Sequence, residues 1–346
     1  MDSLYQTLII REIREEAKEV KTFYFEENPA SKIVYESGQY LTLVRQTPTG
    51  EIRRSYSITS SPMLSEPLAI GVKRIDNGLF SRYLIDHAKP GEVVYTTGAG
   101  GFFTLPPDIS TYKHVFFCAA GSGITPIYSL LKTILHAHPA LNVTLIYSNH
   151  SVEDTIFWDE LQQLAQRFPE ELQLEFLFSN NPNLNRARLH KSLLHTFWQQ
   201  YVAIPPEQVL SYICGPLNYM RMCTYALREM GVPANNIRKE NFNTDKPVLH
   251  NEPPDTEPHL VTINYRHQQF SLVVQYPKTI LQTAKEAGII LPYSCEAGRC
   301  GNCVAQCIQG KVWLAYNEVL TDKELANGLT LTCVGYPVKG DVLLRM

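Results

Sequence analysis

The sequence predicts a multidomain protein: an antiparallel β-barrel or sandwich, then an α/β domain with a parallel sheet, then a smaller domain that holds a cysteine-rich loop. Three observations lead to this prediction. The chain has 346 residues, more than one hydrophobic core usually serves. Its hydrophobic pattern changes near residue 107 from short alternating runs to strands that alternate with helices. A segment rich in proline and acidic residues, 246–258, then separates off the C-terminal part.

Composition narrows the class of function. The chain is 44% hydrophobic and 19% charged, which is enough apolar material for sizeable cores, and its formal charge of −3 does not suggest binding to nucleic acid or an anionic membrane. Residues 1–30 lack the apolar core of a signal peptide, and no run approaches the roughly 20 apolar residues of a membrane helix. We therefore expect a soluble, cytoplasmic protein. Among its eight cysteines, five follow residue 290, which favours metal binding or redox chemistry over a disulfide framework.

The first predicted domain, 1–106, consists of short strands with turn signals between them. Its alternating runs are TFYFE, YLTLVRQ, SYSITSS, LAIGVKRI and EVVYTT. The second domain, 107–245, places each apolar strand before a helical stretch, as in HVFFCAA before ITPIYSLLKTILHAH, NVTLIYSN before DTIFWDELQQLAQRF, and VLSYICGP before LNYMRMCTYALREMG. Such alternation is typical of βαβ units and a parallel sheet.

The third domain, 259–346, follows the predicted linker. It begins with a hairpin, VTINYR and QFSLVVQ around His267 and Gln268, and continues with the helix TILQTAKEAG, the cysteine loop and further short strands. No internal repeat is visible.

The loop SCEAGRCGNC carries Cys295, Cys300 and Cys303 in the spacing C-x4-C-x2-C, and Cys333 lies further along the chain. Four thiolates in this spacing are the plant-type ligand set of a [2Fe-2S] cluster, and Gly298 and Gly301 allow the tight turns that such a loop needs. A zinc site is the alternative, although structural zinc sites usually use two short cysteine pairs. Cys307 is interpreted as a small buried residue on a strand, and Cys118 and Cys223 as core residues.

The order of hairpin, helix, cysteine loop and closing strands resembles the plant-type ferredoxin domain, an α+β fold of the β-grasp kind. A second resemblance concerns Arg54, Tyr56 and Ser57, which form R-x-Y-S and match the flavin motif of the ferredoxin-NADP reductase superfamily. The resemblance implies a β-barrel for the first domain. It also implies that Arg54 pairs with flavin phosphate, Tyr56 lies on the isoalloxazine ring and Ser57 sits near N5. Taken alone, this motif would also suit an exposed polar strand face.

The family's second flavin element, G-x-x-S-x-x-L, begins at Gly78 and includes Ser81. It follows a strand that contains Val72 and Lys73. A glycine turn that opens a helix offers free amides to a diphosphate, although an ordinary turn before a helix would look the same. Because the element resembles the family's diphosphate site, the resemblance implies FAD over the FMN that some relatives use.

The nicotinamide residues are expected in three segments. The first segment contains Gly121 and Gly123, which allow close approach of a pyrophosphate. Thr125 follows, and then Pro126, which suits the first turn of a helix. This G-x-G-x-x-P pattern matches the reductase superfamily and differs from the dinucleotide fingerprint G-x-G-x-x-G. The resemblance also implies that Cys214, in Cys214-Gly215-Pro216, lies beside the nicotinamide C4. Ser179, Arg186 and Arg188 occupy the region that would contact a 2'-phosphate, which favours NADPH slightly over NADH. Glu240-Asn241-Phe242 resembles the element that closes this domain near the flavin.

Together these resemblances span nearly the whole chain. The chain is most similar to the reductase components of multicomponent oxygenases, including that of the phenylacetyl-CoA epoxidase system. They imply an oxidoreductase in which electrons pass from NAD(P)H to FAD, then to the cluster, and then to an oxygenase partner. Tyr56, Ser57 and Cys214 would lie at the reacting rings. Two alternatives remain at this stage: a stand-alone reductase of small acceptors, and a redox-sensing iron-sulfur flavoprotein.

Overall fold

The computed structural model describes residues 5–26, 32–47, 50–243 and 252–346. It divides into two compact units, Tyr5–Glu240 and Asn241–Met346. Residues 246–251 of the predicted linker 246–258 lie outside the described residues. Within the described ranges, no helix combines the length and apolar character needed to cross a bilayer.

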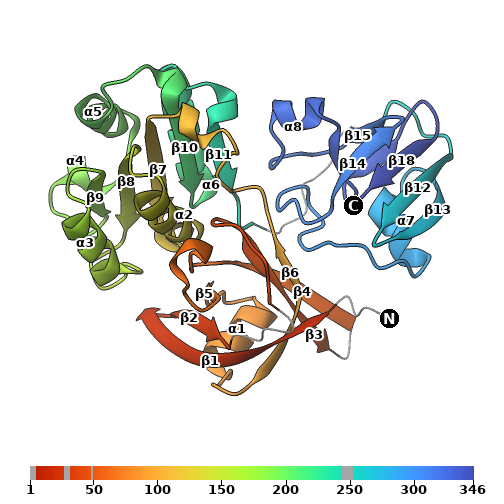
Figure 1. The fold of residues 1–346 in the computed structure, drawn as a ribbon, viewed down its shortest axis with the longest axis horizontal. Coiled ribbons are helices and arrows are strands. Elements are labelled where there is room, and N and C mark those ends of the chain that lie inside the picture. Colours follow the sequence, from red (N-terminus) through yellow and green to blue (C-terminus); the bar gives the residue numbers. More distant parts are fainter. Residues whose placement is uncertain (1–4, 27–31, 48–49, 244–251) are drawn as a thin grey trace. The chain divides into compact units, whose positions relative to one another are not determined.

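The first part of unit Tyr5–Glu240 is an antiparallel sheet with strand order β4-β3-β6-β1-β2-β5 (Figure 1). An antiparallel bridge between Ile58 and Ile70 joins the two outer strands and closes the sheet into a barrel. Side chains such as Ile10 and Phe23 alternate into its core, as period-two strands require. The bounds are β1 Gln6–Ala17, β2 Val20–Phe25, β3 Tyr40–Thr47, β4 Gly50–Ser57, β5 Ala69–Lys73, α1 Leu79–Asp86 and β6 Val93–Gly100. The predicted barrel is therefore confirmed.

The second part of the same unit is a parallel sheet with order β11-β10-β7-β8-β9. Its strands are β7 His114–Ala120, β8 Asn142–Asn149, β9 Leu172–Phe178, β10 Val209–Cys214 and β11 Ile237–Glu240. Alternate residues of β7 enter two separate cores, Phe117 on one face and Phe116 on the other, so both faces are covered by helices. The helices are α2 Ile124–Ala137, α3 Trp158–Arg167, α4 Leu184–Ala187, α5 Lys191–Tyr201 and α6 Leu217–Glu229. The predicted α/β domain is confirmed.

This strand order places a topological switch between β7 and β10. From β7 the chain continues to β8 and β9 on one side, then returns to β10 on the other side. Crevices for ligands form at the carboxyl ends of strands at such switches. Ala120 and Cys214, at the ends of these two strands, therefore mark the expected binding edge.

One predicted helix is too long at its start. The stretch 154–168 was expected to be helical throughout, but α3 begins at Trp158. A turn held by the bond from the Thr155 hydroxyl to the Ser151 carbonyl precedes it, and Phe157 has a left-handed backbone with φ 59°. Burial of the Phe157 ring, stacked on Tyr128, offsets that unfavourable conformation.

Unit Asn241–Met346 contains a mixed sheet with order β13-β12-β18-β14-β16 and a small second sheet of β15 and β17. The strands are β12 His259–Tyr265, β13 Gln268–Val274, β14 Val304–Gln309, β15 Val312–Leu314, β16 Leu329–Leu331, β17 Gly335–Pro337 and β18 Val342–Arg345, and the helices are α7 Ile280–Glu286 and α8 Asp322–Ala326. The β-grasp prediction is confirmed. The hairpin turn lies one residue earlier than expected, at Arg266 and His267, because Gln268 already pairs with Tyr265.

Close packing joins the barrel to the parallel-sheet part at Gly38. Its φ is +88°, and a Cβ there would lie 2.0 Å from the Phe103 carbonyl oxygen and 3.0 Å from Leu130 Cγ in α2. Gly91 has nearly the same φ, +87°, but nothing lies within 4 Å of its Cβ position. Both glycines have a strained backbone, but only Gly38 is also crowded by neighbouring atoms. Substitutions at the two positions therefore distinguish the cost of backbone strain from the cost of crowding.

We expect Gly91→Ala to destabilise this unit by about 1–2 kcal/mol, the cost of a left-handed backbone. Gly38→Ala should cost about 1–3 kcal/mol more, because overpacking adds to the same strain. Urea unfolding followed by the release of flavin fluorescence measures both variants. Equal losses of stability would contradict the tight contact at Gly38.

Candidate functional site

The cysteine loop lies between α7 and β14 and has no regular secondary structure. Three of its residues have left-handed backbones, namely Glu296, Gly298 and Gly301, with φ of 51°, 70° and 75°. A Cβ on Gly298 would lie 2.9 Å from the Tyr316 carbonyl oxygen. These turns curl the loop, and the Ala297 amide donates to the Cys295 sulfur at 3.4 Å. The fourth cysteine, Cys333, follows β16.

The four predicted thiols form one group: Cys295 bonds to Cys300 and Cys333 to Cys303, and electrostatic interactions also link Cys300 with Cys303 and Cys333 with Cys295. The bond from Cys300 and nearby backbone amides lower the pKa of Cys295 to about 6, whereas the contact with Cys303 and burial raise the pKa of Cys333. Among the described residues, no three His, Cys, Asp or Glu side chains converge on a point that could hold one metal ion. Four thiols in one group can supply the four thiolates that a [2Fe-2S] cluster shares between its two irons.

Cys307 stands apart from these pairs. It lies on β14, is partly buried, and its sulfur approaches the carbonyl oxygens of Gln309 and Gly310 at 3.5 and 3.6 Å. Its place on a strand agrees with the prediction, although its burial is incomplete. Cys118 and Cys223 are fully buried, as expected for core residues.

The predicted flavin motif occupies the end of β4. Ser57 is buried, and its hydroxyl has no hydrogen-bond partner among the described residues. Tyr56 is half-buried and packs its ring edge-to-face with Phe80 at 6.2 Å. Arg54 is exposed and donates to the Arg53 carbonyl at 2.7 Å. An unsatisfied buried hydroxyl is costly, so Ser57 fits the role of a donor to a flavin nitrogen.

The second flavin element lies where β5 leads into α1. Gly78 is the N-cap of α1 and no side chain caps its amides, which leaves the first turn able to bind an anion. The Ser81 hydroxyl instead accepts from the Ile75 amide and donates to the Gly78 carbonyl, both at 3.2 Å, so it shapes the turn. Val72 is buried in the barrel core and Lys73 is exposed. Only the backbone of Val72 is therefore suited to contact a cofactor.

The two nicotinamide segments meet at the sheet edge. A Cβ on Gly123 would lie 2.2 Å from the Cys214 carbonyl oxygen and 2.9 Å from the Gly215 nitrogen. Only glycine allows this approach, which brings together the loops that follow β7 and β10. The Cys214 thiol is fully buried, and burial raises its pKa. Gly215 is itself close-packed, because a Cβ there would meet Ala120 Cβ at 2.9 Å.

The helix that follows the glycine loop faces the barrel. Pro126 lies in the first turn of α2, as predicted. The Thr125 hydroxyl donates to the Ser122 carbonyl at 2.9 Å, while its methyl group lies 2.5 Å from the Cβ position of Gly71 in β5. The glycine loop and the flavin-bearing barrel therefore touch directly at Thr125.

Glu240 ends β11 in register with Cys214. One carboxylate oxygen, Oε2, is buried and has no hydrogen-bond partner among the described residues. Burial raises the pKa of Glu240 to about 8. The sequence singled out this residue by resemblance, and the structure places it beside the buried thiol.

The predicted 2'-phosphate residues behave differently from one another. Arg188 is exposed and Ser179 is partly exposed. Arg186 forms an ion pair of 2.6 Å with Glu175. Sequence reasoning missed His150, whose Nδ1 lies 3.0 Å from the Ser179 hydroxyl. Its position directly after β8, at the binding edge of the sheet, was the signal that could have identified it.

Three family models match successive parts of the chain, in the order of the barrel, the parallel sheet and the C-terminal mixed sheet. Residues 7–105 match the oxidoreductase FAD-binding domain, residues 117–224 the oxidoreductase NAD-binding domain, and residues 263–338 the 2Fe-2S iron-sulfur cluster binding domain.

Two characterised relatives align along nearly the whole chain. The ferredoxin reductase component of 3-ketosteroid-9-alpha-monooxygenase from Mycobacterium tuberculosis is 32% identical, over 97% of this chain and 94% of its own length. One subunit of the 1,2-phenylacetyl-CoA epoxidase from Escherichia coli is 29% identical, over 98% of this chain and 97% of its own length. Among solved structures, phthalate dioxygenase reductase shares the fold, with a TM-score of 0.60, 23% identity, and coverage of 99% of this chain and 98% of that one.

We expect Cys300→Ser to lose most of the protein's bound iron, because the variant removes one member of a thiol pair. Cys307→Ser is the matched control, and it should keep about two irons per chain. Iron analysis and the visible spectrum of the purified proteins measure both. Equal loss of iron in the two variants would contradict the ligand set Cys295, Cys300, Cys303 and Cys333.

Proposed function

The chain belongs to the family of ferredoxin reductase components of oxygenases, and from this membership we propose what its individual residues do in the reaction. The protein is an NAD(P)H-dependent oxidoreductase that passes electrons from the nicotinamide through FAD to a [2Fe-2S] cluster, and on to an oxygenase component. FAD supplies the exchange between two-electron hydride chemistry and one-electron transfer to the cluster. The gathering of the four thiols Cys295, Cys300, Cys303 and Cys333 in one group carries this proposal.

On the flavin side, we assign three residues of β4. Ser57 would donate its otherwise unpaired hydroxyl to the flavin near N5, and Tyr56 would cover one face of the ring. Arg54, exposed at the same strand, would pair with flavin phosphate through its guanidinium fork. The uncapped first turn of α1 at Gly78 supports a diphosphate, and therefore FAD.

On the nicotinamide side, Gly121, whose Cβ position is open, would let a pyrophosphate approach the start of α2, while Gly123 keeps the main chain of Cys214 close. Cys214, with Gly215 and Pro216, would form the wall beside the reacting carbon. The Cys214 thiol stays protonated near neutral pH, because burial raises its pKa. It therefore excludes water and packs against the ring without adding a charge.

The preference for NADPH is a finer proposal. The pair formed by Ser179 and His150 offers two polar groups at the edge of the sheet, and the exposed Arg188, nine residues after Ser179, offers a positive charge. Residues 176–189 contain no carboxylate that would repel a phosphate. Arg186 is less suited, because Glu175 already neutralises it.

We expect Arg188→Ala to raise the KM for NADPH about tenfold and to leave the KM for NADH nearly unchanged, since a hydrogen bond to a charged group contributes about 1.5–3 kcal/mol. Arg186→Ala is the matched control and should change either KM less than threefold. Steady-state reduction of ferricyanide measures all four constants. A wild-type protein that prefers NADH would contradict this proposal.

The electron path is tested by anaerobic titration of the protein with NADPH. We expect the flavin absorbance to bleach and a rhombic [2Fe-2S] signal to appear in low-temperature EPR, because both carriers belong to one chain. In the Cys300→Ser variant, the flavin absorbance should bleach but the [2Fe-2S] EPR signal should not appear. Bleaching of the wild-type flavin while its cluster stays oxidised would contradict electron transfer between the carriers.

A further inference from the structure

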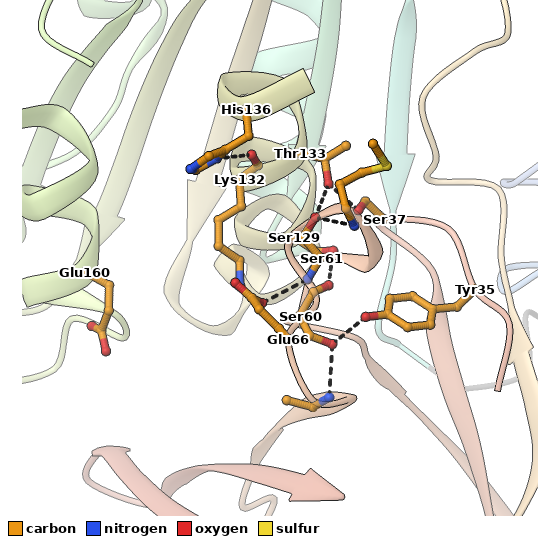
Figure 2. A network of polar contacts seen from close by, with 12 residues as sticks. Tyr35, Ser37, Ser60, Ser61, Glu66, Ser129, Lys132, Thr133, His136 and Glu160 are labelled. Carbon is orange, nitrogen blue, oxygen red and sulfur yellow. Dashed lines mark hydrogen bonds and ion pairs between the residues drawn. The ribbon is translucent and has the colours of Figure 1, made fainter. Parts of the chain in front are cut away.

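A buried polar contact joins the barrel to helix α2 within unit Tyr5–Glu240 (Figure 2). The Ser129 hydroxyl donates to the Ser60 carbonyl at 2.6 Å, and the Ser61 hydroxyl lies 2.7 Å from that of Thr133. Ser37 reaches the same Thr133 hydroxyl at 2.5 Å. All these side chains are buried. Polar groups from two separate segments of the barrel, Ser37 and Ser60–Ser61, therefore bind one face of α2.

An ion pair extends this contact. Lys132, a residue only 7% exposed, binds the Glu66 carboxylate through its ammonium group. The same carboxylate oxygen accepts from the Ser61 amide at 3.0 Å. Lys132 also lies over the Tyr128 ring, 4.4 Å from its centroid. Burial lowers the pKa of Lys132, although Glu66 opposes the effect. Such burial is costly, so Lys132 depends on Glu66 being held in place.

A second ion pair crosses between the same two parts. Arg14 of β1 binds Glu160 of α3 at 2.5 Å, and Arg14 also binds Glu16 of its own strand at 2.8 Å. Glu160, labelled in Figure 2, is therefore engaged by Arg14. The Lys132 side chain is 9% exposed and that of Arg14 40%, whereas Glu66 and Glu160 are similarly exposed, so the Glu66–Lys132 pair has the better shielded cation.

The position of this contact links it to the reacting centre. Ser60 lies three residues after Ser57, the last residue of the flavin strand β4. Ser129 lies one helical turn after Thr125, which belongs to the segment of the glycine loop. Between them, the Thr125 methyl group packs on Gly71. Displacement of α2 along the barrel would therefore displace the glycine loop relative to Ser57.

Directional bonds restrict such a displacement more than apolar packing does. A hydrogen bond weakens steeply when its distance or angle changes, whereas packed helices slide by small shear movements at modest cost. We propose that Lys132, Glu66 and Ser129 are positioning residues, which fix α2 in register with the flavin strand and so set the approach of the nicotinamide to the flavin. This inference rests on hydride transfer within this unit and adds residues that touch neither cofactor motif.

The test is rapid anaerobic mixing of the flavin-loaded protein with its preferred nicotinamide. Lys132→Met removes the charge and keeps a long side chain. We expect its limiting rate of flavin reduction to fall at least about tenfold, because a misplacement near 1 Å costs up to about a hundredfold in rate. The nucleotide dissociation constant should change less than about threefold, since Lys132 is not among the residues assigned to the nucleotide. Lys132→Arg should restore part of the rate.

Lys191→Met is the matched control, because its ion pair with Glu229 is exposed at both ends and lies on α5 and α6. It should leave the rate and the flavin reduction potential unchanged. A Lys132→Met protein with a wild-type limiting rate and only a lower melting temperature would overturn the proposal. If that variant does not fold, Ser129→Ala decides, with about a threefold loss of rate expected and an unchanged rate overturning it. A wild-type flavin that no nicotinamide reduces would instead refute the electron-transfer function itself.

Discussion

The proposed nicotinamide site depends on one close contact, between Gly123 and the main chain of Cys214. Because no side chain fits between them, the loops after β7 and β10 meet at the carboxyl edge of the parallel sheet. The switch in strand order makes these two strands neighbours, although about ninety residues separate them in the sequence. The same edge holds Glu240, in register with Cys214. The topology thus determines which segments can share a site, and glycine determines how closely they approach.

In the C-terminal unit, the main physical constraint is repulsion between like charges. Four sulfurs must come close together, although each would repel the others as a thiolate. Left-handed backbone at three loop positions turns the chain so that amides face the sulfurs, and one such amide already donates to Cys295. Oriented amide dipoles of this kind stabilise negative charge without adding a counter-ion. The arrangement suits a carrier that receives one electron at a time.

Local sequence patterns were sufficient for much of this structure. The cysteine spacing, the R-x-Y-S strand and the glycine loops all concern neighbouring residues, so their pattern is visible in the chain itself. The α3 boundary was predicted wrongly, because the tertiary burial of Phe157 outweighs its backbone preference. The contact of Lys132 with Glu66 was not predicted, because it joins residues 66 positions apart. A lysine in an amphipathic helix normally indicates an exposed face.

The buried charge at Lys132 also restricts how this chain can be recombined with others. A chimera that takes its barrel from a relative without a carboxylate at position 66 would leave the Lys132 ammonium over the Tyr128 ring without its bonded carboxylate. Removing one partner of a buried pair typically costs about 3–5 kcal/mol. The two halves of this unit therefore form one module for protein engineering, and an exchange of either half has to transfer both members of the pair together.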